Sequence, residues 1–325
     1  MTEIKEQNRF LPPMRMHPAY RHGDMTPWGG EQLKTVFGKD IPDERTGEAL
    51  EMSVIPGLES TDDDGVTLTA LIIPALRLTG LPEGTEFPLL LKLLAAKGTL
   101  SVQVHPDDEY AKAHENKLGK TEAWVILHAE EGASLLYGIR EGVTIDDLRR
   151  ALTGGEDVEP LIQRIPVKAG DVFYMPAGMV HAIGGGILLY EIQQSSDVTY
   201  RLWDFNRVND KGEKRPLHIR QSLDVIRPEL KGQRAHMPEH PAQEITRLLD
   251  VPAFTLDCVA ADGACILPAA ETFRVLTALE PLTLRWLEGE MELKAGDTVL
   301  LPAACPEVGL EGHGRALVSG VGSRA

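Results

Sequence analysis

Two segments of the chain repeat one pattern at an interval of 126 residues. VKAGDVFYMPAGMVHAI at 167–183 resembles LKAGDTVLLPAACPEVGL at 293–310, and six residues recur at the same spacing: Lys168, Ala169, Gly170, Asp171, Pro176 and Ala177. Gly-Asp and Pro-Ala pairs mark turns, so we favour duplication of a β-turn-β unit, with convergence on a common turn as the alternative. Two modules of short strands predict a mainly β protein built from barrels or jelly rolls, which often hold a ligand in their mouth.

The patterns between these segments predict short helices and further strands. Helical insertions are expected at about 107–120, which is polar and follows Pro106, and at 144–165, which opens with a Thr cap and acidic residues and has a Gly-Gly stop before a second short helix. The segment near 33–37 permits a short helix. The apolar run FPLLLKLLAAKGTLSVQV, residues 87–104, fits either a buried helix or two buried strands, and the Lys97-Gly98 pair favours two pieces.

The length of 325 residues suggests about two domains. We predict a catalytic domain over 1–243 and a smaller C-terminal β-domain over 244–325, with the charged segment 206–244 as an excursion and linker. In the second copy of the repeat Glu307 stands where the first has His181, and no pair of histidines accompanies it. The C-terminal domain is therefore expected to be noncatalytic and to cover an edge of the first sheet.

Composition excludes several classes of function. The net charge of −16 disfavours nonspecific binding to nucleic acid or to anionic membranes, so an anionic substrate needs a local basic pocket. No stretch approaches the roughly 20 apolar residues of a membrane span, and MTEIKEQNRF lacks the apolar core of a signal peptide, so we expect a cytoplasmic protein. Three cysteines without CxxC spacing argue against a disulfide framework and against a cysteine zinc site.

A second constraint lies in SVQVHPDD, residues 101–108. If this segment is a strand, Gln103 and His105 point to one face, where polar groups at the end of an apolar run need partners. The string Gly170-x5-Pro176-x-Gly178-x-x-His181 sets another imidazole just after a tight turn. This spacing resembles the second metal-binding motif of the cupin superfamily, whose jelly-roll barrel it implies. Gln103-x-His105 with Glu122 takes the place of the superfamily's His-x-His and Glu.

These four side chains together suit one divalent ion such as Zn²⁺. Two imidazole nitrogens, a carboxylate and an amide oxygen leave a position open for water or substrate, which is typical of catalytic zinc sites. A single histidine near an apolar strand is more often a hydrogen-bonded core residue, and only the cluster favours a metal site. The other histidines lack such a setting and are expected at the surface: His17, His22, His114, His128, His218, His236, His240 and His313.

A closer resemblance emerges from four segments in order: LSVQVHPDD, GKTEAW, GDVFYMPAGMVHAIGGG and YEIQQSSDVTYRLWDF. The chain resembles class I mannose-6-phosphate isomerase (phosphomannose isomerase) in its short bacterial form, from PWGG at 27–30 to GDTVLLPA at 296–303. The resemblance implies one zinc ion per chain, held by Gln103, His105, Glu122 and His181. It also implies active-site roles for four residues: Arg201, Glu191, Lys120 and Lys92. Ser101 is predicted to bind substrate, and Trp28 and the GEALEMS stretch at 47–53 are expected to frame the cavity mouth.

The implied reaction interconverts mannose 6-phosphate and fructose 6-phosphate by moving a proton between C2 and C1 through an enediol. Zinc acts as a Lewis acid, and Arg201 either neutralises the enediolate or binds the phosphate with a lysine. Glu191 is the candidate base, and an ion pair with Arg201 is its alternative role. Lys120 is expected to be catalytic, and Lys92, Ser101 and Arg201 to bind substrate. Leu50 stands where the family usually has an aromatic residue.

Two other functions stay open at the level of sequence. An iron-dependent cupin oxygenase also uses two histidines and a carboxylate, although Gln103 occupies a position that oxygen chemistry needs. A noncatalytic cupin that binds sugar phosphates is the second alternative. In each case the expected partner is a small molecule, without nucleic acid or membrane, and the protein is expected to be a monomer or weak homo-oligomer.

Overall fold

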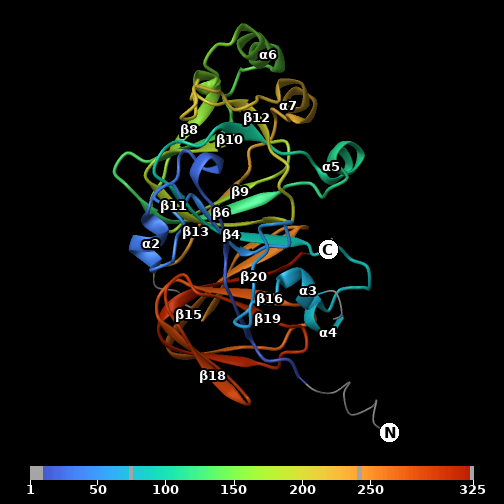
Figure 1. Ribbon diagram of the computed structural model, residues 1–325, viewed down its shortest axis with the longest axis vertical. Coiled ribbons are helices and arrows are strands. Elements are labelled where there is room, and N and C mark those ends of the chain that lie inside the picture. The colour runs from blue at the N-terminus through green and yellow to red at the C-terminus, as the bar shows by residue number, and fades with distance from the viewer. Residues whose placement is uncertain (1–9, 73–75, 240–243, 323–325) are drawn as a thin grey trace. The chain divides into compact units, whose positions relative to one another are not determined.

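The computed structural model describes residues 10–72, 76–239 and 244–322 (Figure 1). The chain divides into two compact units, one comprising Met1–Ala19, Leu50–Leu90 and Pro238–Ala325 and the other Tyr20–Ala49 and Leu91–Met237. The predicted division at 243/244 into a catalytic and a noncatalytic domain is a statement about function and stays a prediction. None of the helices in the described ranges is long and apolar enough to cross a membrane.

Strands dominate, as predicted for a mainly β protein. One sheet has seven strands in the order β13 (Gln233–His236), β9 (Asp171–Met175), β6 (Glu122–Ala129), β11 (Ile187–Gln194), β4 (Leu89–Ala96), β3 (Glu48–Met52) and β2 (Ala19–Arg21). A second sheet has five strands in the order β12 (Tyr200–Trp203), β5 (Val102–Val104), β10 (His181–Ile183), β7 (Ser134–Ile139) and β8 (Ile162–Pro166). The candidate site draws its residues from these two sheets.

The third sheet contains the repeated segment at 293–310. Its strands are β1 (Met14–Met16), β19 (Thr298–Leu301), β16 (Arg274–Ala278), β20 (Val308–Val321), β15 (Phe254–Leu267) and β14 (Ile245–Asp250), with β17 (Leu282–Trp286) and β18 (Gly289–Leu293) joined through β20. The helices of the same unit are α3 (Leu68–Ile72) and α4 (Leu76–Thr79). Cys258, Cys265 and Cys305 are buried free thiols here.

The two repeated turns have the same geometry. In the first, Asp171 accepts a hydrogen bond from the Lys168 N–H at 3.0 Å and Gly170 has φ +89°. In the second, Asp297 accepts from the Lys294 N–H at 2.9 Å and Gly296 has φ +85°. Glycine tolerates this left-handed conformation, so the recurrence of Gly in the repeat has a backbone cause. Each turn leads into a short strand, β9 or β19.

The apolar run at 87–104 forms two strands, β4 and β5, separated by Lys97–Ser101. All eight residues of β4 are buried, which is why its alternation could not be read from the sequence. The helices of the same unit are α2 (Gln32–Phe37), α5 (Asp108–Glu115), α6 (Ile145–Gly154) and α7 (Ile219–Val225), with 3-10 turns η1 (Gly23–Met25) and η2 (Glu159–Leu161).

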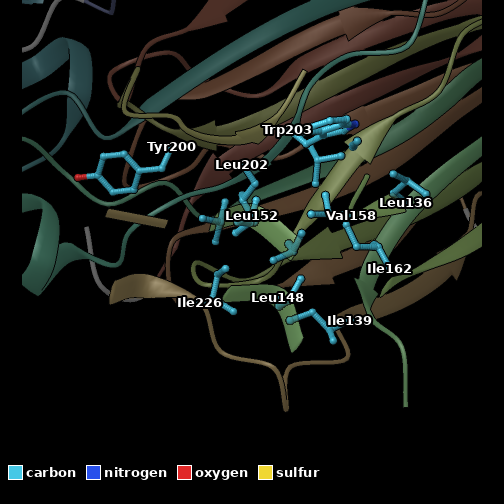
Figure 2. Packing of buried hydrophobic residues seen from close by; sticks show 14 of the residues in the cluster. Leu136, Ile139, Leu148, Leu152, Val158, Ile162, Tyr200, Leu202, Trp203 and Ile226 are labelled. Carbon is cyan, nitrogen blue, oxygen red and sulfur yellow. The ribbon is translucent and has the colours of Figure 1, made fainter. Parts of the chain in front are cut away.

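Both predicted helical insertions exist, but the second is shorter than predicted. Thr144 caps α6 through a capping box with Asp147, and Gly155 ends it. The predicted helical range extended to 165, whereas residues from Ile162 onward form β8, because their backbone pairs with β7. Leu148 and Leu152 of α6 are buried among Ile139 and other apolar side chains (Figure 2). Burial of each such leucine contributes about 1.5–3 kcal/mol.

Candidate metal centre and active site

A row of directly opposed residues crosses three strands of the five-stranded sheet. Gln103 on β5 is paired with His181 on β10 and with Arg201 on β12. Opposed residues in antiparallel strands present their side chains on the same face. The Gly178 N–H donates to the carbonyl of His105 at 2.8 Å, and Gly178 has φ +89°. The turn before β10 is thereby tied to the end of β5, which brings His181 beside His105.

The two imidazoles are oriented by backbone carbonyls. His105 Nδ1 donates to the carbonyl of Val198 at 3.0 Å, and His181 Nδ1 donates to the carbonyl of Met179 at 2.9 Å. Their Nε2 atoms face Glu122, the first residue of β6, at 3.5 and 3.1 Å from its carboxylate oxygens. The ligand atoms of these three buried residues lie within 4.8 Å of one another. The predicted juxtaposition of His105, Glu122 and His181 is observed.

Charge interactions fix the ionisation of this cluster. Burial, reinforced by the positive charge of Lys120, holds the pKa of His105 well below its usual value, so the ring is neutral at pH 7. Burial alone raises the pKa of Glu122, but Lys120 and the two imidazoles outweigh it and hold that pKa well below its usual range. Glu122 is therefore a carboxylate that faces the Nε2 atoms of the two imidazoles.

The donor set fits a divalent cation. A carbonyl can only accept, so each Nδ1 carries a proton, and in the neutral ring of His105 the Nε2 atom then presents a lone pair. Glu122 Oε1 is buried 3.1 Å from His181 Nε2, yet it accepts no hydrogen bond from any described residue. The Glu122 carboxylate and the two Nε2 atoms thus face one another, and the carbonyls of Val198 and Met179 hold the two rings in place. This arrangement is expected around a metal ion. Gln103 lies next to them, with its amide nitrogen 3.5 Å from His181 Nε2.

Two buried lysines continue the cluster into the seven-stranded sheet. Lys120 Nζ lies 3.0 Å from His105 Nε2 and hydrogen-bonds to Glu122. Lys92 on β4 donates to Glu191 on β11 at 3.0 Å, and Lys120 lies 3.9 Å from the same Glu191 oxygen. Burial lowers the pKa of Lys92, but Glu191 and Glu48 outweigh it and leave the pKa raised. Glu191 thus pairs with Lys92, and the alternative pairing with Arg201 is not observed.

Arg201 is held by neutral groups. Its Nε donates to the Ser101 hydroxyl at 3.3 Å and its Nη1 to the carbonyl of Pro216 at 2.9 Å. No carboxylate of the described residues forms an ion pair with it, and burial together with Arg215 lowers its pKa. The neighbouring Arg215 is instead bonded through two nitrogens to Asp204. Among the described residues Arg201 is therefore a cation without an ion-pair partner, and Asp204 acts on it only at longer range.

These groups border one cavity of about 440 Å³. Five cationic and four acidic side chains line it: Arg21, Lys92, Lys120, Arg201, Arg215, Asp24, Glu48, Glu191 and Asp197. Ser101, Gln103 and Trp28 also line it, so Lys92, Ser101 and Arg201, which were predicted to bind substrate, border the same cavity. The triad of His105, Glu122 and His181 is not in the lining, but Lys120 and Gln103, which contact it, are. Leu50 is fully buried and is not part of the lining.

Two contributors were absent from the predicted site. Glu48 accepts a hydrogen bond from Arg21 at 3.1 Å and lies 3.8 Å from Lys92. Acidic and basic side chains therefore alternate in the order Glu191, Lys92, Glu48 and Arg21. Its signal in the sequence is a pair of carboxylates, Glu48 and Glu51, in the short segment EALEM, all of which is buried. His218 was predicted at the surface, but it is half-buried and its Nδ1 accepts from the Arg201 N–H at 3.1 Å. This contact could not be predicted from the sequence, because His218 and Arg201 are 17 residues apart and meet only when α7 packs against β12.

The remaining histidine predictions divide in three ways. Five of these side chains are exposed, as expected: His17, His114, His128, His236 and His313. His22 is half-buried beside Asp43, at 2.6 Å. His240 lies outside the described residues. In the C-terminal copy of the repeat, Glu307 is exposed, and the only metal-ligand group found in the described part of the chain is the triad above.

Comparison with known proteins gives a consistent result. The family model of the phosphomannose isomerase type I catalytic domain matches residues 15–131. Mannose-6-phosphate isomerase ManA of Bacillus subtilis is 38% identical over 301 residues, which cover 90% of this chain and 94% of the relative. Mannose-6-phosphate isomerase of Streptococcus mutans is 49% identical over 203 residues, which cover 61% of this chain and 64% of that protein.

Solved structures agree with these matches. The crystal structure of the mannose 6-phosphate isomerase from Bacillus subtilis superimposes with a TM-score of 0.87 at 32% identity, covering 95% of this chain and 99% of that one. A putative mannosephosphate isomerase from Archaeoglobus fulgidus, at 21% identity and a TM-score of 0.77, shares the fold over 96% of this chain and 99% of its own. The predicted cupin-type fold is confirmed. The chain belongs to the type I phosphomannose isomerase family.

Proposed function

We propose that this protein is a zinc-dependent isomerase that interconverts D-mannose 6-phosphate and D-fructose 6-phosphate. The observation that carries the proposal is the pair of buried imidazoles, His105 and His181, whose Nε2 atoms face the Glu122 carboxylate beside a cavity lined by lysine and arginine. The names of the Bacillus subtilis and Streptococcus mutans relatives support the same substrate.

Zinc would be held by His105, His181, Glu122 and the amide oxygen of Gln103, one ion per chain. The amide of Gln103 already lies against His181, and rotation of its terminal group by a half-turn exchanges nitrogen for oxygen. When bound, the ion supplies Lewis-acid polarisation of substrate oxygens. A fourth protein ligand disfavours the iron oxygenase alternative, because that chemistry needs two open positions.

Arg201, with Ser101, binds the anionic part of the substrate or its developing enediolate. Its guanidinium has no carboxylate partner among the described residues, so a substrate oxyanion gains the full interaction. Lys92 and Lys120 add positive charge at the other wall of the cavity. Lys120, between Glu122 and Glu191, is placed to donate a hydrogen bond to a substrate oxygen.

Glu191 is the proposed base. Its carboxylate takes the proton from C2 of the aldose while O1 gains a proton, which gives the enediol; it then returns a proton to C1 while O2 loses its hydroxyl proton, which gives the ketose. Lys92 holds the carboxylate in place at 3.0 Å. Burial excludes water from this pair, so a proton held on Glu191 can return to substrate before it exchanges with solvent.

The proposal places the protein in the cytoplasm as a monomer or weak homo-oligomer whose partner is a hexose phosphate, without nucleic acid or membrane. Its C-terminal region, 244–325, is proposed to be noncatalytic, since its copy of the repeat has Glu307 in place of His181.

The test is isomerisation of mannose 6-phosphate in deuterated water, followed by proton NMR. We expect fructose 6-phosphate to form and deuterium to enter the reacting carbons during turnover or on prolonged equilibration. Binding of the sugar phosphate without isomerisation and without exchange would establish the noncatalytic alternative instead.

A further inference from the structure

A second cavity, of about 420 Å³, opens on the eight-stranded sheet. Its walls come from β14, β15, β16 and β20 and from the 267–272 loop, all within one unit of the chain. We propose that this cavity is a separate binding site for a small organic oxyanion, a carboxylate or phosphate ester, recognised by Arg274 and Thr255. The inference concerns binding alone and does not depend on the isomerase reaction.

The cavity lies at the end of the apolar interior of this unit. Arg274 and Leu276 are two residues apart on β16 and so share a face, as do Thr255, Asp257 and Val259 on β15. Leu276 and Val259 belong to the buried apolar cluster, together with Val318 of β20. The polar residues therefore stand where the apolar interior ends, which is the position of a ligand site in the mouth of a barrel.

A cross-strand row creates the space. Gly320 on β20 is paired with Arg274 on one side and with Thr255 on the other. A Cβ atom at Gly320 would lie 2.6 Å from the Thr255 hydroxyl and 3.9 Å from Arg274 Cγ. Gly320 does not have a positive φ, so backbone conformation does not require glycine at this position. The missing side chain instead leaves space between the Arg274 guanidinium and the Thr255 hydroxyl.

Arg274 is a half-buried cation with unused donors. Its Nη2 donates to the carbonyl of Pro268 at 2.6 Å, and no carboxylate of the described residues forms an ion pair with it. Burial lowers the pKa of Arg274, which is the cost of removing the guanidinium from water. An oxyanion in the cavity would relieve this cost through the remaining N–H groups.

Arg247, in the same lining, provides the contrast. It hydrogen-bonds to both oxygens of Asp257 and donates to Asp250 at 2.9 Å, so its charge is already neutralised. Arg274 is therefore the arginine of this lining that makes no ion pair with a carboxylate of the described residues, although Asp257 acts on it at longer range. Val259, Leu267 and Val318 give the lining an apolar part that suits the carbon skeleton of an organic anion. The cavity volume lies within the usual range for small-molecule sites.

The experiment uses the full-length, zinc-loaded protein labelled with ¹⁵N-arginine. Succinate and inorganic phosphate are titrated separately at constant ionic strength while the Nε–H correlations are recorded, with the Arg274 signal assigned from Arg274→Lys. We expect this signal to shift and saturate with a Kd of about 1 mM or tighter for at least one anion, whereas the Arg247 signal stays in place. Comparison of the two anions shows whether the site prefers carboxylate or phosphate.

Gly320→Ala supplies the matched test, with Gly309→Ala on the same strand as control, because a Cβ there meets only Arg285 Cβ, at 4.0 Å. We expect Gly320→Ala to weaken the Arg274 response at least tenfold, and both variants to retain the isomerase kcat. The proposal is overturned if the Arg274 signal in the wild-type protein does not move, or if it moves together with that of Arg247 and equally with chloride.

Discussion

The ammonium of Lys92 lies 3.0 Å from the carboxylate of Glu191, and both side chains are buried. Glu48 stands 3.8 Å from the same ammonium, so Lys92 interacts with two buried acids, although Arg21 also pairs with Glu48 and Lys120 lies 3.9 Å from Glu191. A buried ion pair contributes little when compared with an apolar replacement, but removal of one partner leaves the other charge without compensation. Lys92 therefore has a structural role as well as a place in the cavity.

Replacement of Lys92 by Met tests that role. We expect the free energy of unfolding of Lys92→Met to fall by about 3–5 kcal/mol, and the double variant Lys92→Met/Glu191→Gln to recover part of this loss. Urea unfolding measures both. Lys97→Met, at an exposed lysine just beyond β4, is the control and should change stability by less than about 0.5 kcal/mol. A Lys92 effect no larger than that of Lys97 would contradict the structural role.

Glu191→Gln tests the proposed base. The amide keeps the shape of the side chain but cannot take a proton, so we expect kcat to fall by about 10²–10⁴-fold with unchanged zinc content. Steady-state kinetics with metal analysis gives both quantities, and Glu131→Gln at an exposed position serves as control. A Glu191→Gln enzyme with more than about a tenth of the wild-type kcat would exclude Glu191 as the base.

Much of this site follows from sequence because its residues sit in short, rigid patterns. The alternation of Gln103 and His105 and the glycine and proline before His181 specify local backbone conformations, and those conformations aim the side chains. Glu48 and the Lys92–Glu191 contact could not be derived in this way. Their juxtaposition depends on the order of β3, β4 and β11 in the sheet, which no local pattern specifies.

The same distinction applies to the fold. The capped start of α6 and the KAGD turns were predicted because their hydrogen bonds lie within four residues. The strand character of Ile162–Ile165 was missed because it arises from pairing with β7, and the fully buried β4 has no alternation to detect. Tertiary pairing decided both cases.

Arg201→Lys separates substrate charge stabilisation from metal binding. Lysine keeps a positive charge but loses the second donor, so the contacts to Ser101 and to the carbonyl of Pro216 cannot both persist. We expect full zinc content and a kcat lower by about 10²–10³-fold. Arg140→Lys, at an exposed arginine that also donates to a backbone carbonyl, is the matched control. Loss of zinc from Arg201→Lys would show that Arg201 instead supports the metal cluster.

Acid stability of the zinc-free protein reports on the cluster. The pKa of His105 in the folded protein lies well below its ordinary value of 6.5. Between these two pKa values the unfolded chain therefore binds a proton at His105 that the folded chain does not. The contribution of His105 to the free energy of unfolding is complete above the unfolded pKa and is lost as pH falls from about 6.5 toward the folded pKa. Because the pKa of Glu122 is also lowered, the free energy of unfolding falls further below pH 4.5, the ordinary pKa of a glutamate. We expect His105→Gln to flatten the fall in unfolding free energy between about pH 6.5 and 5, measured by urea unfolding. An identical pH profile in His105→Gln would contradict a buried neutral His105.

The most direct measurement is a titration of chelator-treated protein with Zn²⁺ that follows bound metal and the conversion of mannose 6-phosphate to fructose 6-phosphate together. We predict that activity of the wild-type protein rises in proportion to bound zinc up to one ion per chain, without dioxygen. His181→Ala should bind no stoichiometric zinc and stay inactive. His128→Ala, at an exposed position on β6, is the control and should behave as wild type. Full isomerase activity without metal, or zinc and turnover retained in His181→Ala, would contradict the account.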